Sequence, residues 1–277
     1  MISDPFQNFR QIVDRPNEQI DLGRAALAIA LDDYPALEIP TYLARLNELA
    51  AAVTRHIGPQ ADVYRKILGL NTVLFGQERF RANRAEYFDP KNSFLNEVLD
   101  RKTGIPITLS VLYMEVAQRV ELPLAGVSFP GHFLVKYGSG DDEIILDPFN
   151  EGEMKTTANL KKMIDEQYSG KVKFQRDFLE ASTKKQILKR MLNNLKVIYL
   201  RDDALMKALP VIERMVILDP AGADDIRDRG MVYLKLECFK QAREDFERYL
   251  ALEPDAPDAR RIRDTVIDLT KQSGSIH

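Results

Sequence analysis

Apolar residues recur at helical spacing through the N-terminal third of the chain. They predict helices over residues 22–32, 41–56, 63–74 and 95–101. The segment DYPALEIP separates the first helix from the second, because its prolines interrupt the helical pattern. The stretch from Asn83 to Phe94 is rich in Asn, Asp and Pro, and we expect it to form a loop before the last of these helices.

The segment from Ile105 to Val120 is apolar on nearly every side. This pattern is typical of a helix that is buried all round. Thr103 is the expected N-cap, and Pro106 falls in the first turn, where a missing N–H removes no helical hydrogen bond.

Beyond this helix the hydrophobic period changes to two, which predicts strands over residues 124–129, 132–137 and 143–147. From about residue 183 the pattern is helical again to near the end of the chain. The predicted fold class is therefore α+β: a helical N-terminal part and an antiparallel sheet packed on a central helix, followed by an all-α region.

The second and third strands are expected to form a hairpin whose loop is Gly138–Asp141. This loop places Lys136 opposite Glu143 and brings apolar residues together elsewhere, as cross-strand pairing prefers. The same register sets His132 opposite Asp147.

A histidine that faces an aspartate has a chemical use. The carboxylate fixes the tautomer of the imidazole and stabilises the imidazolium, as in sites built from a nucleophile, a base and an orienting group. The alternative is a purely structural polar pair that pins the hairpin.

The C-terminal region contains a repeat with a spacing of 34 residues, the period of tetratricopeptide repeats (TPR). Equivalent residues include Tyr199 and Tyr233, Ala208 and Ala242, and Pro220 and Pro254. We predict TPR-like helical hairpins over residues 189–222 and 223–256, with a capping helix over 257–271. The predicted domains are accordingly residues 1–182 and 183–277.

Charge and composition narrow the class of partner. The formal net charge is −3, whereas nucleic-acid-binding proteins usually carry a basic surplus. No apolar run reaches the length of about 18 residues that a membrane span needs. We therefore expect no nucleic-acid or membrane partner.

The cysteine content suggests a reducing compartment, and we expect a cytoplasmic protein. The single cysteine, Cys238, excludes an intrachain disulfide and a cysteine metal cluster. There is no HExxH motif and no GxxxxGK[ST] phosphate loop, so we expect neither a metal nor another cofactor.

Several motifs taken together resemble a known family. NSFLN, GIPITLS, FPGHF and LDPF, followed by the repeats, are similar to the bacterial transglutaminase-like/TPR proteins known as SirB-one-like. The resemblance covers nearly the whole chain. It implies a transglutaminase/papain-like core, in which His132 and Asp147 match the superfamily's catalytic His and Asp.

The resemblance also implies that the nucleophile is missing. Counted back from Leu122-Pro123, the position of the superfamily's catalytic cysteine falls on Pro106. Two nearby hydroxyls, Thr108 and Ser110, are weak candidates for a replacement, although residues of these types near a helix start commonly bond the backbone.

Three functions follow as hypotheses. The first is a non-catalytic protein that binds a protein or peptide, through a cleft lined by His132 and Asp147 and through the TPR region, and so acts as a regulator. Other residues expected to line this cleft are Asn83, Arg84, Tyr87 and Asn92. The second is a hydrolase or amide-processing enzyme, in which His132 activates Ser110, Thr108 or a water molecule. The third is a scaffold whose His–Asp pair is only structural.

Overall fold

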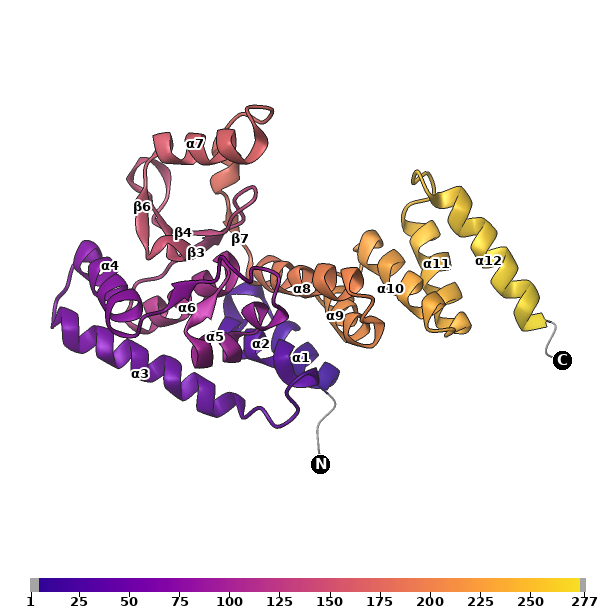
Figure 1. The fold of residues 1–277 in the computed structure, drawn as a ribbon, viewed down its shortest axis with the longest axis horizontal. Helices are drawn as coiled ribbons and strands as arrows, with labels where there is room; N and C mark the ends of the chain where they lie inside the picture. Colours follow the sequence, from indigo (N-terminus) through magenta and orange to yellow (C-terminus); the bar gives the residue numbers. More distant parts are fainter. Residues whose placement is uncertain (1–4, 275–277) are drawn as a thin grey trace. The chain divides into compact units, whose positions relative to one another are not determined.

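The computed structural model describes residues 5–274. These residues form two compact units, and the boundary along the chain lies between Met191 and Leu192. The first unit is mixed α and β, and the second is entirely helical (Figure 1). This confirms the predicted α+β fold class with a helical C-terminal region. The units divide inside a helix, whereas the predicted domain boundary lies at the start of that helix.

The N-terminal part of the first unit consists of helices. They are α1 (Pro5–Val13), α2 (Leu22–Ala28), α3 (Ile39–Ile57), α4 (Val63–Asn71) and α5 (Leu95–Arg101). The predicted helix over residues 63–74 is split, because α4 changes after Asn71 into a π-helical segment, Thr72–Gln77. The helix α1 was not predicted from the sequence.

The central helix α6 (Pro106–Arg119) is buried along Pro106–Ala117, its polar residues included. It packs against α2, α3, α4 and α5 and against two strands of the sheet. Burial on every side explains why its apolar residues show no single face. The predicted N-cap is wrong: Ile105 takes that position, and Thr103 belongs to a short strand.

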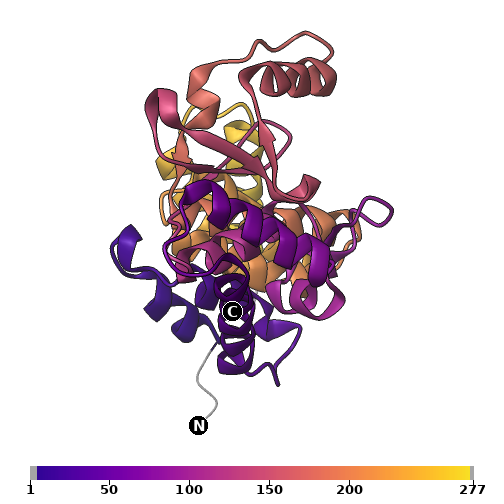
Figure 2. The same ribbon diagram turned by 90° about the vertical axis from the view of Figure 1, so that its left-hand side faces the viewer.

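The main sheet is antiparallel and has the strand order β6-β5-β4-β3-β7. Its strands are β3 (Ala125–Val127), β4 (Leu134–Tyr137), β5 (Ile144–Asp147), β6 (Glu153–Lys155) and β7 (Ala181–Ser182). A separate parallel pair joins β1 (Arg81–Ala82) to β2 (Thr103–Gly104). In Figures 1 and 2 the helix α7 (Thr157–Tyr168) lies on the side of the main sheet opposite α6.

The face of the sheet under α7 forms a hydrophobic cluster. Leu160 and Ile164 of α7 pack there with Val127, Leu134 and Ile145 of the strands. These strand residues share one face because cross-strand neighbours point to the same side of a sheet. The sheet is thus covered on both faces.

The predicted register of the β4–β5 hairpin is wrong by two residues. Lys136 pairs with Ile145 rather than with Glu143, and the connection covers residues 138–143. The longer connection has room for a 3₁₀ turn, Gly140–Asp142, and holds Gly138 and Gly140 at positive φ. A shift of two residues preserves the period of the strand, so every side chain stays on its predicted face.

The second unit is a set of helical hairpins. Its helices are α8 (Lys184–Arg201, shared with the first unit), α9 (Leu205–Leu218), α10 (Ala223–Lys235), α11 (Phe239–Leu252) and α12 (Ala259–Gly274). Ala208 and Ala242, which are equivalent in the repeat, are both fully buried. The equivalent prolines, Pro220 and Pro254, each follow the end of a helix.

Gly230 of α10 lies in close contact with Phe246 of α11. A Cβ atom at this position would lie 2.8 Å from the Phe246 ring. We expect Gly230→Val to lower the free energy of unfolding by about 2 kcal/mol, because the buried ring has no space to move into. Urea unfolding followed by circular dichroism measures this loss.

A matched control is Gly76→Val, since a Cβ at Gly76 meets nothing within 4 Å. That variant should stay within about 0.5 kcal/mol of the wild type. Equal stability of the two variants would contradict the packing described for Gly230.

Candidate functional site

His132 lies in a tight turn before β4 rather than in the strand, so the predicted strand over residues 132–137 begins two residues too early. Its backbone N–H donates to the carbonyl of Phe129 at 3.0 Å. Gly131 precedes it at φ +70°, a conformation that glycine adopts without strain. Arg190 of α8 donates to the backbone carbonyl of His132 at 2.7 Å. The turn is therefore fixed from both sides.

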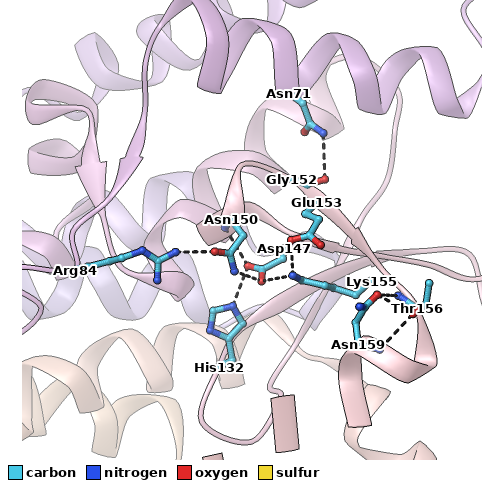
Figure 3. A network of polar contacts seen from close by, with 10 residues as sticks. All are labelled: Asn71, Arg84, His132, Asp147, Asn150, Gly152, Glu153, Lys155, Thr156 and Asn159. Carbon is cyan, nitrogen blue, oxygen red and sulfur yellow. Dashed lines mark hydrogen bonds and ion pairs between the residues drawn. The ribbon is translucent and has the colours of Figure 1, made fainter. Parts of the chain in front are cut away.

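The His132 ring contacts the aspartate that the sequence set opposite it. Nε2 of His132 lies 2.9 Å from Oδ1 of Asp147, the last residue of β5 (Figure 3). The Asp147 side chain is fully buried, and the His132 side chain is 13% exposed. With Nε2–H donating to the carboxylate, the ring is held in one tautomer and one orientation.

Asp147 accepts further hydrogen bonds. The Asn150 side chain donates to Oδ2 at 2.6 Å, and Lys155 Nζ lies 3.5 Å from the same oxygen. Burial, the largest single influence, raises the pKa of Asp147. The hydrogen bonds and charges of His132, Asn150 and Lys155 together bring this pKa below its ordinary value. The buried carboxylate is therefore kept ionised.

We expect Asp147→Asn to destabilise the protein by about 2 kcal/mol at neutral pH, because it removes a charge that three partners satisfy. A carboxyl group whose pKa is lowered by folding stabilises the folded state above its unfolded pKa. This stabilisation disappears as the pH falls through the lower, folded pKa.

The stability difference between wild type and Asp147→Asn should therefore be full at pH 7 and shrink below the ordinary aspartate pKa of 3.8. Urea unfolding at a series of pH values measures it. The exposed Asp165 offers a control, since Asp165→Asn should change little at any pH. A difference that grew on acidification would contradict the lowered pKa.

The second ring nitrogen, Nδ1 of His132, makes no hydrogen bond to any residue in the described part of the chain. This nitrogen is not fully enclosed by the described residues, so solvent reaches it. In a triad-like site this nitrogen would face the nucleophile.

Pro106 occupies the first turn of α6 and is buried. Ser110 follows one turn later on the same face of the helix, and its hydroxyl lies 3.5 Å from the carbonyl of Phe133, the residue after His132. The first turns of α6 therefore lie beside the His132 turn. The resemblance places the superfamily's cysteine in the first of these helical turns, at Pro106.

Neither candidate hydroxyl bonds the histidine. Ser110 is fully buried and directed at the Phe133 carbonyl. Thr108 is also fully buried: its Oγ1 donates to the carbonyl of Asn92 at 2.8 Å and accepts from the N–H of Ile105 at 3.1 Å. Both hydroxyls serve the backbone, as is common near helix starts.

Two of the predicted binding residues hold the loop before α5. Asn83 donates to the side-chain oxygen of Asn92 at 3.0 Å, and Asn92 donates to the carbonyl of Glu86 at 2.7 Å. Both asparagines are buried. Their amides fix the loop, and any contact with a ligand stays a prediction.

The other two predicted residues are exposed. Arg84 donates to the side-chain oxygen of Asn150 at 2.6 Å and stacks on the ring of Phe149, with Cζ 4.5 Å from the ring centre. Tyr87 is 40% exposed. The burial of its other part raises the pKa of its hydroxyl, and the positive charge of Arg190 lowers this pKa by a smaller amount. The loop thus reaches the surroundings of both Asp147 and His132.

Sequence reasoning missed Asn150, Lys155 and Arg190. Asn150 directly follows the LDPF motif, so its place next to Asp147 could have been inferred from the turn that begins there. Lys155 comes from β6, which was not predicted. Arg190 belongs to a helix assigned to the repeats, and no local pattern connects it to His132.

Within residues 5–274, no group of three or more His, Cys, Asp or Glu side chains is arranged to hold a metal ion. No helix in that range is both long enough and apolar enough to cross a membrane.

Comparison with known proteins identifies both parts of the chain. Residues 40–193 match the profile of the Transglutaminase-like superfamily, and residues 195–266 match the Tetratricopeptide repeat profile. The first match covers more than half of the chain. The expected family resemblance, a transglutaminase-like core followed by tetratricopeptide repeats, is therefore confirmed.

Relatives extend over nearly the full length. A "UPF0162 protein" of Xylella fastidiosa (strain 9a5c) is 33% identical over 99% of this chain and 98% of its own. "Protein SirB1" of Salmonella typhimurium (strain LT2) is 25% identical over 88% of this chain and 90% of its own. Among solved structures, a crystal structure of menin aligns over 91% of this chain and 70% of the menin chain, with a TM-score of 0.36 and 8% identity. The chain belongs to the UPF0162/SirB1 family of bacterial proteins, in which a transglutaminase-like domain is followed by tetratricopeptide repeats.

Proposed function

We propose that this chain is a non-catalytic member of the transglutaminase-like superfamily that binds a partner protein and thereby regulates it. The transglutaminase-like unit holds an extended peptide segment of the partner beside His132. The repeats bind a second part of the same partner, in keeping with the general role of tetratricopeptide repeats in protein–protein interaction.

This proposal rests on the His132–Asp147 contact, together with Pro106 at the position where the resemblance places the superfamily's cysteine. Proline has no nucleophilic group, so a thioester cannot form at Pro106. The neighbouring hydroxyls are buried and bonded to backbone carbonyls. A base without a nucleophile can still bind, because the open Nδ1 of His132 can accept a hydrogen bond from a peptide N–H.

The runner-up function is hydrolysis by a water molecule that His132 activates. The solvent-reached Nδ1 favours it, since a general base needs only a water within hydrogen-bond distance. Hydrolysis also needs donors that stabilise the oxyanion of the transition state. A scaffold with a purely structural pair is the third alternative.

A cytoplasmic location is part of the proposal. It rests on the single cysteine, Cys238, which leaves the fold independent of an oxidising compartment. Fractionation of cells that express the chain with a C-terminal epitope tests it, with recovery in the cytoplasmic fraction as the expected result.

Panning a random peptide library displayed on phage against the immobilised full chain tests peptide binding. We expect enriched peptides that bind the wild type and are lost on His132→Gln. Glutamine still donates a hydrogen bond to Asp147 but offers no ring nitrogen, and circular dichroism checks that the variant is folded.

Two results would contradict the proposal. Failure to enrich any peptide would argue against peptide binding by the unit. Peptides that bind the wild type and His132→Gln equally well would place the binding surface away from the His–Asp pair.

A further inference from the structure

A hollow of about 360 Å³ lies next to the His132–Asp147 pair in the first unit. Residues from β1, the loop after it and the 3₁₀ turn after β5 line it: Arg81, Ala82, Arg84, Phe149, Asn150 and Glu151. Asn150 connects this hollow to the site, because its amide donates to Asp147 while its oxygen accepts from Arg84 (Figure 3).

Arg84 is held in place at the hollow. Its guanidinium group lies over the Phe149 ring and uses one N–H on Asn150. A guanidinium group has five N–H donors in a planar fork, so most of the donors of Arg84 remain for a ligand. A fixed arginine loses less conformational entropy on binding than a mobile one.

Arg81 is oriented by the backbone. Its Nη1 donates to the carbonyls of Phe75 and Phe80, the latter at 2.8 Å. Nη1 also lies 3.8 Å from a carboxylate oxygen of Glu151, but both side chains of this pair are about half exposed or more. An exposed ion pair of this kind contributes little to stability, so Arg81 can exchange Glu151 for the carboxylate of a ligand.

The charges of the hollow favour a single negative charge. Arg81 and Arg84 contribute two positive charges, and Glu151 contributes one negative charge. The remaining charge matches a carboxylate better than a phosphate group, which carries nearly two negative charges at neutral pH.

Phe149 joins the hollow to His132. One face of its ring carries Arg84, and the ring meets the His132 ring at 72° with 5.7 Å between centres. A ligand group that contacts Arg84 is therefore separated from His132 by the Phe149 ring. An extended peptide spans that distance within about two residues at ~3.3 Å each.

We infer that the hollow is a carboxylate subsite: it receives an acidic side chain, or the C-terminal carboxylate, of the peptide segment that lies along Phe149 toward His132. This inference rests on the proposed peptide binding and adds the chemistry of the segment. The planar forks of Arg84 and Arg81 give the carboxylate paired, charge-assisted hydrogen bonds.

The test uses synthetic copies of the peptides enriched by panning, titrated against the full chain by fluorescence anisotropy. Each peptide is made with every Glu and Asp changed to Gln and Asn, and separately with its C-terminal acid changed to an amide. These two arms distinguish a side-chain carboxylate from a terminal one.

We expect one of the two arms to weaken binding about tenfold, as expected for the loss of a charge-assisted hydrogen bond. Arg84→Gln should weaken the parent peptide by a similar factor and make it insensitive to the same change. Arg84→Lys should restore part of the affinity, since it keeps the charge but not the fork. Arg81→Gln, which leaves the Arg84–Phe149 stack intact, gives a second readout.

Arg65 supplies the control, because it is exposed on α4 and does not line the hollow. Arg65→Gln should leave every affinity unchanged. If neither arm nor Arg84→Gln changes the affinity more than about twofold, while His132→Gln still abolishes binding, the carboxylate subsite is wrong and the proposed function stands. If no peptide binds at all, both are wrong.

Discussion

Replacing Pro106 with cysteine should create a thiol that reacts with iodoacetamide at pH 6 at least about tenfold faster when His132 is present than when it is absent. Position 106 lies in the first turn of α6, where the helix dipole favours a thiolate. A positive charge on a nearby imidazole favours the thiolate further. The effect is large because few ordinary thiols are ionised at this pH.

The measurement follows alkylation of Pro106→Cys by mass spectrometry over a range of pH, in a background where Cys238→Ser removes the natural thiol. Adding His132→Ala gives the matched control. Substituting this proline is structurally mild, because a residue in the first helical turn has no intrahelical partner for its N–H.

Equal alkylation rates with and without His132 would show that position 106 does not face the histidine. The assignment of Pro106 to the lost nucleophile would then be wrong. A fast, His132-dependent thiol would instead support the view that a single substitution separates this site from a reactive one.

The largest loss of stability is expected in the repeat unit, from Arg229→Met. Arg229 makes a two-pronged contact with Asp245, with nitrogen–oxygen distances of 2.7 and 2.6 Å. The Asp245 side chain is 6% exposed, so removing the guanidinium group leaves a buried charge without this partner. We expect the free energy of unfolding to fall by about 3 kcal/mol.

Urea unfolding followed by circular dichroism measures this loss, and the double variant Arg229→Met with Asp245→Leu is the control. The double variant should recover most of the stability, because buried ion pairs are often replaceable by apolar residues. A loss below about 1 kcal/mol in the single variant would mean that solvent or another cation compensates Asp245.

Strong periodicity made several elements predictable from the sequence. The helix over residues 95–101 was predicted with its observed bounds, and the central helix was placed within a residue at each end. In the repeats, the equivalent prolines and small residues allowed the 34-residue period and the helical hairpins to be predicted. These positions are constrained by close packing, which leaves a clear signal in the sequence.

Helix α7 was missed because little of it is buried. Only Leu160 and Ile164 are buried in it, and most of its other residues are polar. Its start is set by a capping interaction between Thr156 and Asn159 rather than by the more recognisable Glu or Gln. The strands β6 and β7 are too short, at three and two residues, to show alternation.

The contact between His132 and Asp147 was expected for a reason that is only partly right. The predicted strand pairing was off by two residues. The His132 ring nevertheless contacts the Asp147 carboxylate, because His132 lies in a turn and not in the paired strand. Arg190, which fixes that turn, lies 58 residues farther along the chain. Contacts made by long side chains across such separations leave no periodic pattern.

The central claim, that the His–Asp pair serves binding and not catalysis, is tested most directly by hydrolysis of p-nitrophenyl acetate. The rate of p-nitrophenol release is compared between the full chain and His132→Ala at equal concentration. We predict equal rates that reflect only background surface reactivity. Faster release by the wild type, lost in His132→Ala and retained in Arg65→Gln, would contradict the claim and establish His132 as a catalytic residue, acting as a nucleophile or as a base.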